Sequence, residues 1–182
     1  EYVKLEEISF TSQEIKKMPE SIKLQIQKYT SHKYISLTSR GNTAIDTAYQ
    51  ILKKKGIKNI LIPDQGTWIH YIKAAKKYNL NIELVKTNNA LLDLKDLRKK
   101  LSPKSAFVYV QLAAYILPQP IAEIQEICSK SKTPIVMDVT GTIGAATCSG
   151  QYADYMICSF GKHKPIDAGY GGFISSKESI TV

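Results

Sequence analysis

The stretch IVMDVTGTIGAATCSGQYADYMICSFGKHKPIDAGYGGFI, residues 135–174, decides the fold. It contains two short apolar runs bounded by turn residues, a pattern typical of strands buried in a parallel sheet. The first run ends on Asp138, and the second ends on Ser159 and leads to Lys162 and Lys164. Because ligands bind beyond the carboxyl ends of the strands in an open α/β sheet, we expect these side chains to face one crevice.

Outward from this stretch, short apolar runs alternate with amphipathic segments and short connections. The pattern predicts strands over 34–38, 59–62, 82–85, 106–111, 135–138, 155–158 and 171–175. It predicts helices over 44–52, 67–78 and 91–101, a helix after Pro120, and short helices around Pro19. Such alternation implies right-handed βαβ units. We therefore predict an α/β fold: a three-layer α/β/α sandwich around a mostly parallel seven-stranded sheet.

The chain divides into a polar arm, residues 1–33, and one ligand-binding domain, residues 34–182. The arm carries no catalytic residue type in a convincing setting, and such arms most often fray or pack on a neighbouring subunit. The remaining length is enough for a single domain with a real hydrophobic core.

Composition narrows the classes of partner. The formal net charge is +9, but the basic residues are almost all lysines spread over the predicted helices, with Arg40 and Arg98 as the arginines. This pattern favours a solvated surface over a nucleic-acid interface. The three cysteines show no CxxC spacing, which predicts buried thiols in a reducing cytoplasm rather than disulfides or metal ligands. No apolar run approaches the roughly 20 residues of a membrane span, and no signal-peptide pattern begins the chain, so we expect a cytoplasmic protein without a membrane contact.

The segment Ser39-Arg40-Gly41-Asn42-Thr43 lies between a predicted strand and a predicted helix. Free N–H groups and the helix dipole attract an anion there, and Gly41 allows a phosphate to approach the backbone. Asn42 or Thr43 can add a side-chain donor. The alternative is simple helix capping by Ser39 or Asn42. Neither GxGxxG nor GxxxxGK[ST] occurs in the chain, which argues against a dinucleotide or P-loop site.

Three further positions carry chemistry, each with a plainer alternative. Trp68, the only tryptophan, follows a predicted strand end and is either a stacking platform or a core residue. Asp138 ends an apolar strand, where a carboxylate needs a partner, and either caps a loop or faces a cationic ligand atom. Lysines are usually solvated, but Lys162 and Lys164 lie in a tight turn between buried strands. A desolvated lysine beside another cation can act as an amine nucleophile toward an aldehyde.

Some polar residues are weaker candidates. Gln111 and Tyr115 follow another strand end and could contact a ligand. For His32 and His163 a packing or surface role is the better interpretation, and His70 is interpreted as an ordinary helix residue.

An anion cradle, an aromatic plate, a carboxylate and an amine on four strand ends match the needs of pyridoxal 5′-phosphate. Its aldehyde condenses with a lysine, its ring nitrogen pairs with a carboxylate, and its ring stacks on an aromatic side chain. The sequence therefore predicts a site for this cofactor.

The order of these residues resembles that of fold-type I pyridoxal-phosphate enzymes, the aspartate aminotransferase superfamily, and most of all the DegT–StrS aminotransferase group. The lysine turn of that group reads Ser-Phe-x-x-x-Lys, with glycines five, seven and eight places later. Ser159, Phe160 and Lys164 match it, and the glycines follow at 169, 171 and 172. Residues 41–43 resemble the group's Gly-Thr-Ala phosphate loop, Thr67-Trp68 its Thr-aromatic stacking pair, and the segment from Asp138 its Asp-Ala-Ala-Gln motif.

The resemblance implies roles for the matched residues. Lys164 becomes the Schiff-base lysine, with Lys162 as the alternative because Ser159 to Lys162 also reads Ser-x-x-Lys. Asp138 keeps the ring nitrogen protonated, Ser159 binds phosphate, and residues 34–182 form the cofactor-binding large domain. Family members continue into a small carboxy-terminal domain, which we expect to be absent here, and Gly141 stands where the family has a Gln or His that contacts the ring hydroxyl.

The resemblance thus predicts an aminotransferase-like enzyme that acts on a small amino substrate, and a homodimer. Two alternatives remain: a truncated or degenerate relative that binds cofactor or a partner without turnover, and a tRNA-linked pyridoxal-phosphate enzyme.

Overall fold

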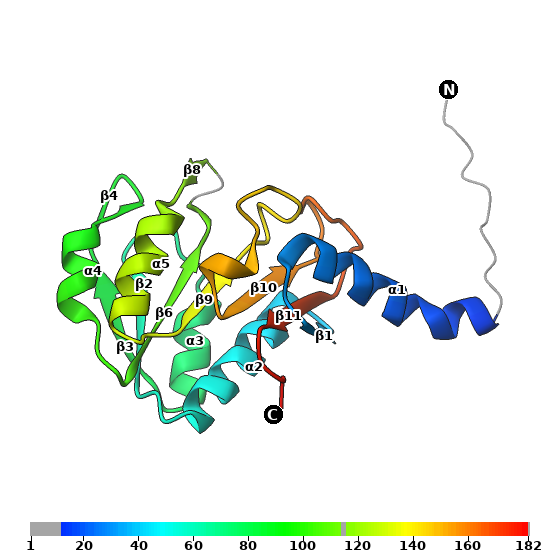
Figure 1. Cartoon of the computed structure of the whole chain (residues 1–182), viewed down its shortest axis with the longest axis horizontal. Helices are drawn as coiled ribbons and strands as arrows, with labels where there is room; N and C mark the ends of the chain where they lie inside the picture. The colour runs from blue at the N-terminus through cyan, green and yellow to red at the C-terminus, as the bar shows by residue number, and fades with distance from the viewer. Residues whose placement is uncertain (1–11, 114–115, 182) are drawn as a thin grey trace.

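A computed structural model describes residues 12–113 and 116–181 of the chain (Figure 1). Its centre is a seven-stranded sheet with the strand order β1-β11-β10-β9-β6-β2-β3. The strands, in chain order, are β1 (Tyr34–Thr38), β2 (Asn59–Pro63), β3 (Asn81–Val85), β6 (Ser105–Val110), β9 (Ile135–Asp138), β10 (Tyr155–Ser159) and β11 (Gly172–Ser176). The seven predicted strands are confirmed.

The sheet is parallel apart from one strand. β11 pairs antiparallel with both β1 and β10, whereas the pairs β10–β9, β9–β6, β6–β2 and β2–β3 are parallel. The carboxyl ends of six strands therefore share one edge of the sheet, and the beginning of β11 lies at that same edge. This arrangement collects the residues that follow each strand.

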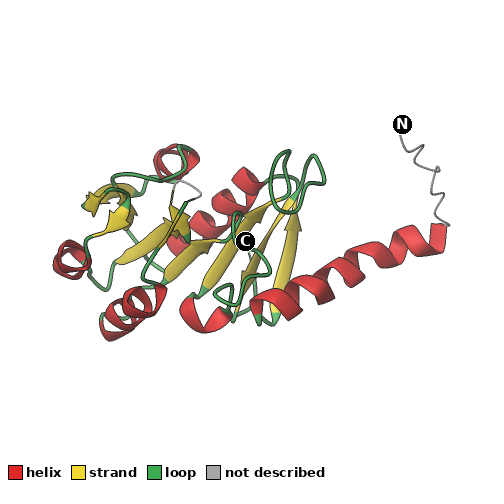
Figure 2. Ribbon diagram, turned by 90° about the horizontal axis from the view of Figure 1, so that it is seen from above, coloured by secondary structure: helices red, strands yellow, loops and turns green. Residues whose placement is uncertain are grey.

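Helices cover both faces of the sheet (Figure 2). Helices α2 (Gly41–Lys54) and α3 (His70–Lys77) pack on one face, where Ile60, Val108 and Val136 point toward them. Helices α4 (Leu94–Lys100) and α5 (Ile121–Lys130) pack on the other, against alternate strand residues such as Phe107 and Met137. Because successive side chains of a strand point to opposite faces, apolar runs buried on both sides are what a three-layer sandwich requires. The predicted fold class is confirmed.

The amino-terminal arm differs from its prediction. Instead of short helices around Pro19, one helix, α1 (Ser12–Thr30), continues through the proline and extends away from the sheet (Figure 1). Its last turns reach the core through Ile26, which is 3% exposed. No helix in the described ranges is both long and apolar enough to cross a membrane.

Two other boundaries also differ from the predictions. Leu91 was expected in a helix but lies in β5 (Leu91–Leu92), which forms a hairpin with β4 (Thr87–Asn88) through two residues of positive φ. Helix α3 begins at His70 rather than Thr67. A second hairpin joins β7 (Leu112–Ala113) to β8 (Leu117–Pro118), and a short 3-10 helix spans Gly150–Tyr152.

Candidate functional site

A cavity of about 470 Å³ lies where the parallel strands end. Small-molecule sites typically enclose roughly 300–1,000 Å³. Most of the residues singled out from the sequence line this cavity: Gly41, Asn42, Trp68, Asp138, Ser159 and Lys164. They end or follow four different strands. The structure therefore brings together residues that lie more than a hundred positions apart in the sequence.

The amino terminus of α2 forms one wall of the cavity. The residue before the helix, Arg40, is extended and makes no side-chain capping bond. The alternative in which Ser39 or Asn42 caps this helix is therefore not what the structure shows. Uncapped N–H groups and the positive end of the helix dipole make this wall suited to an anion.

Close backbone packing shapes this wall. A Cβ atom on Gly41 would lie 2.6 Å from Ser159 Cβ, and one on Gly172 would lie 2.4 Å from the Cys158 carbonyl oxygen and 3.0 Å from Gly41 N. Helix α2, the end of β10 and the start of β11 thus meet with room only for hydrogen. The Gly171 N–H also donates to the Ser39 carbonyl at 2.9 Å, which ties the lysine turn to the same wall.

Asp138 lies at the floor of the cavity and is 9% exposed. Tyr71 donates its hydroxyl to one carboxylate oxygen at 2.8 Å, and the Thr140 N–H donates to the other at 2.9 Å. Burial raises the pKa of the Asp138 carboxyl above its ordinary value, while the bonds from Thr140 and Tyr71 and the positive charge of Lys164 oppose that rise. A cationic partner in the cavity would favour the ionised form further.

The two lysines of the turn have different surroundings. Lys164 is half-buried and lines the cavity, whereas Lys162 is exposed and falls outside the described lining. The Asp167 carboxylate holds the turn between them and β11, because it accepts the His163 N–H at 2.9 Å and the Gly169 N–H at 3.0 Å. These backbone bonds lower the pKa of Asp167 below its ordinary value.

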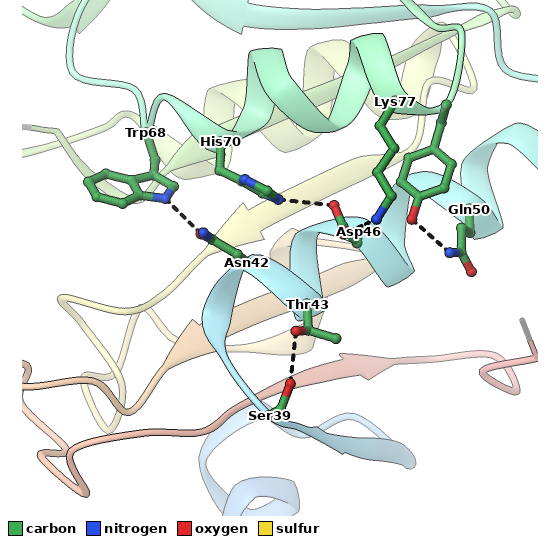
Figure 3. A network of polar contacts seen from close by, with 9 residues as sticks. Ser39, Asn42, Thr43, Asp46, Gln50, Trp68, His70 and Lys77 are labelled. Atoms are coloured by element: carbon green, nitrogen blue, oxygen red, sulfur yellow. Dashed lines mark hydrogen bonds and ion pairs between the residues drawn. The ribbon is translucent and has the colours of Figure 1, made fainter.

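Trp68 stands at the rim, with 51% of its surface exposed, and so is not a core residue. Its indole N–H donates to the Asn42 side-chain oxygen at 2.9 Å, which fixes the ring beside the amino terminus of α2 (Figure 3). Asn42 therefore supports the aromatic plate in addition to the donor role expected for it.

Other predicted residues lie elsewhere. Thr43 does not line the cavity as described, and its hydroxyl contacts that of Ser39 at 3.0 Å. Gln111 holds the loop after β9 by donating to the Thr147 carbonyl at 2.8 Å, and Tyr115 lies outside the described residues. His32 is 1% exposed and packs in the core, in agreement with the interpretation made for it.

Sequence reasoning missed several lining or supporting residues. Tyr71 lies three positions after Trp68, just inside α3, and no sequence pattern links it to its partner Asp138. Thr140 lines the cavity and its hydroxyl accepts the Ser159 N–H at 3.0 Å. Arg40 and the exposed Tyr170 also line the cavity; they lie inside the anion segment and the glycine cluster, but neither was assigned a role from the sequence.

The donor set suits a planar, anionic ligand. Lys164 and Arg40 place two cations against one carboxylate, and the helix terminus adds further positive potential. Trp68 adds an aromatic face, Asp138 a buried carboxylate and Lys164 an amine. The residues present therefore fit pyridoxal 5′-phosphate: a cradle for its phosphate, a plate for its ring, a partner for its ring nitrogen and an amine for its aldehyde.

Comparison with solved structures identifies the fold. The chain has the fold of the large domain of pyridoxal-phosphate-dependent transferases. It superposes on 3-amino-5-hydroxybenzoic acid synthase with a TM-score of 0.73 and 18% identity, covering 89% of this chain and 43% of the other. An aminotransferase from Psychrobacter cryohalolentis gives 0.70 and 18%, with 93% and 48% covered. NtdA from Bacillus subtilis with bound pyridoxamine phosphate gives 0.70 and 19%, with 97% and 47% covered.

The sequence itself identifies the family. Residues 12–181 match the DegT/DnrJ/EryC1/StrS aminotransferase family, and the chain belongs to it. The predicted resemblance is confirmed at this level. No curated protein matches the chain. The chain spans about half the length of the solved structures that it resembles.

Proposed function

We propose that this chain is the cofactor-binding domain of a pyridoxal-phosphate-dependent aminotransferase, with Lys164 as the lysine that holds the cofactor. The observation that carries the proposal is the single cavity in which Lys164, Asp138, Trp68 and Ser159 meet the amino terminus of α2. Family membership supports it. When bound, pyridoxal phosphate supplies an aldehyde that takes up amines and a ring that accepts electrons.

Each residue then has a defined task. The backbone N–H of Gly41, the Asn42 amide and the Ser159 hydroxyl would hold the phosphate, and the Trp68 indole would cover the ring. The Asp138 carboxylate would face the ring nitrogen and would favour its protonated form. The Lys164 amine would hold the cofactor and, when free, would move a proton at the α carbon of an amino substrate. Thr43 is proposed to act on the phosphate cradle only through its contact with Ser39.

Lys164 is preferred over Lys162 on geometry. The Lys164 amine borders the cavity and its charge acts on the Asp138 carboxyl, whereas Lys162 is exposed. Substituting each lysine by alanine and titrating with pyridoxal phosphate tests this choice. We expect a visible absorbance band in the wild type and in Lys162→Ala, and none in Lys164→Ala. The reverse pattern would exchange the two assignments, and a wild type without any band would refute cofactor binding.

A second candidate is a relative that binds the cofactor without turnover. Gly141 favours it, because a glycine cannot supply the side chain that this family uses at the ring hydroxyl. Mixing the loaded protein with a panel of amino acids separates the two functions. An aminotransferase loses its visible band with some of them as the amino group is transferred, whereas a binder keeps the band with all of them.

Assembly follows from the same proposal. Because family sites are completed by a second subunit, we propose a homodimer that acts on a small amino substrate in the cytoplasm. The net charge of +9 keeps tRNA as an alternative partner, which is less favoured because the basic residues are mostly lysines spread along the chain. Light scattering tests the homodimer. Retention on tRNA at moderate salt tests the alternative partner, because purely electrostatic binding weakens steeply with salt.

A further inference from the structure

Helix α2 presents a row of polar side chains toward the segment 68–78. Asn42, Asp46 and Gln50 are four residues apart and so lie on one face of the helix. Figure 3 shows them pointing toward α3 and the residues next to it. Asn42 accepts the indole N–H of Trp68 at 2.9 Å, and Gln50 donates to the Tyr78 hydroxyl at 2.7 Å. The row thus contacts both ends of this segment.

Asp46, in the middle of the row, binds the first and the last residue of α3. One carboxylate oxygen accepts His70 Nε2–H at 3.0 Å, and the other accepts Lys77 Nζ at 2.6 Å. Asp46 and His70 are both mostly shielded, with side chains 19% and 18% exposed. Because the two oxygens of one carboxylate bind the two ends of α3, they limit both the sliding of α3 along α2 and the distance between the two helices.

Helix α3 and the residues just before it position two groups of the site, one that lines the cavity and one that binds a lining carboxylate. Trp68 lies two residues before its first turn and lines the cavity, while Tyr71 in that turn donates to Asp138. A displacement of α3 along α2 would therefore move the aromatic plate and the partner of the buried carboxylate together. Asp46, His70 and Lys77 are not among the described residues that line the cavity, so any effect of theirs on it must pass through α3.

We propose that Asp46 is a positioning residue for the site: by holding both ends of α3 it sets the place of the Trp68 ring and of the Tyr71 hydroxyl. The part of this inference that concerns cofactor affinity rests on the proposed function. The part that concerns the position of Trp68 stands on the contacts alone.

The chain offers a matched control for Asp46. Asp96 in α4 accepts Lys100 Nζ at 2.7 Å and the Lys86 N–H at 2.8 Å, with side-chain exposures of 14% for Asp96 and 24% for Lys100. It is a carboxylate of similar burial with a lysine and one other donor, and it lies on the opposite face of the sheet. Replacing Asp96 by alanine removes an equivalent interaction without touching α2 or α3.

The test uses Trp68, the only tryptophan of the chain, so that indole fluorescence reports on this position alone. Without cofactor, we expect Asp46→Ala to lower the fluorescence anisotropy of Trp68 and to shift its emission, and Asp96→Ala to leave both as in the wild type. Asp46→Asn, which keeps an acceptor for one partner, should give an intermediate change. Where Asp46→Ala does not fold, Lys77→Ala removes the exposed partner alone and should shift the same signals in the same direction.

Titration with pyridoxal phosphate follows. We expect Asp46→Ala to weaken binding by about 5- to 10-fold, the loss of roughly one net hydrogen bond, and Asp96→Ala to bind as the wild type. Equal changes in the Asp46 and Asp96 variants, or unchanged fluorescence in Asp46→Ala and Lys77→Ala, would show that this carboxylate only stabilises the fold. If the wild type binds no cofactor, the proposed function fails, while the fluorescence comparison still decides whether Asp46 positions Trp68.

Discussion

Replacing Gly41 by alanine tests how closely the amino terminus of α2 meets the end of β10. The new Cβ would lie 2.6 Å from Ser159 Cβ, whereas ordinary contact begins at 3.4 Å, so helix and strand must separate by about 0.8 Å. Overpacking of this kind costs about 1–3 kcal/mol. In a domain of this size each kcal/mol lowers the unfolding temperature by roughly 2–4 °C. The same separation would widen the proposed phosphate cradle, so the affinity for pyridoxal phosphate should fall as well.

The control for this change is Gly56→Ala. Gly56 has a φ of +82° with nothing within 4 Å of the added Cβ, so its alanine variant carries backbone strain but no clash and lies away from the cavity. We expect urea unfolding to show a loss of stability in both variants at unchanged m value, and titration to show weaker pyridoxal-phosphate binding only in Gly41→Ala. Ser159→Gly, which removes the atom nearest to the clash, should recover part of the stability lost in Gly41→Ala. A Gly41→Ala protein as stable as the wild type, with unchanged binding, would refute the close packing described.

Three further predictions concern the cavity and the core. Burial raises the pKa of the Asp138 carboxyl, and both of its oxygens accept hydrogen bonds. Asp138→Asn removes the buried charge but keeps only one acceptor, so the unfolding temperature of the cofactor-free protein should change little while pyridoxal-phosphate binding weakens; unchanged binding would contradict this. His32 contacts Ser175 Oγ at 2.9 Å and is held neutral, since burial lowers its pKa. The stability that neutral His32 contributes should therefore be complete above its ordinary pKa of about 6.5. Below that pH the free energy of unfolding should fall by up to roughly 1.4 kcal/mol per pH unit. Urea unfolding at several pH values should show a smaller fall in His32→Gln. Asp167→Ala removes the acceptor of two turn N–H groups, so attachment of the cofactor to Lys164 should slow when followed by absorbance; an unchanged rate would mean that the turn holds its shape without Asp167.

The sheet and most of the site could be predicted from the sequence for one physical reason. Buried parallel strands appear as apolar runs, and their carboxyl ends must meet at one edge, so Asp138 and Ser159 could be placed near Gly41 without coordinates. The same reasoning could not place Lys162 and Lys164, because two lysines in one turn differ only in the direction that the turn gives them.

The errors have equally local causes. Leu91 matched a helical spacing, but the hairpin before it depends on positive φ at Asn89 and Ala90, and alanine gives no turn signal. Helix α1 continues through Pro19 although a proline removes one backbone hydrogen bond. The remaining bonds of the 19-residue helix hold it together, and the sequence pattern does not show this. Tyr71 was missed because its partner, Asp138, is 67 positions away, and such contacts leave no pattern in either segment.

The most direct test of the central claim is to locate the cofactor on the chain. Pyridoxal phosphate is added, the attachment is fixed by borohydride reduction, and the modified peptide is identified by mass spectrometry. The structure predicts the added mass on Lys164. Its appearance on Lys162 or on a surface lysine, or its absence from all peptides, would contradict the site described.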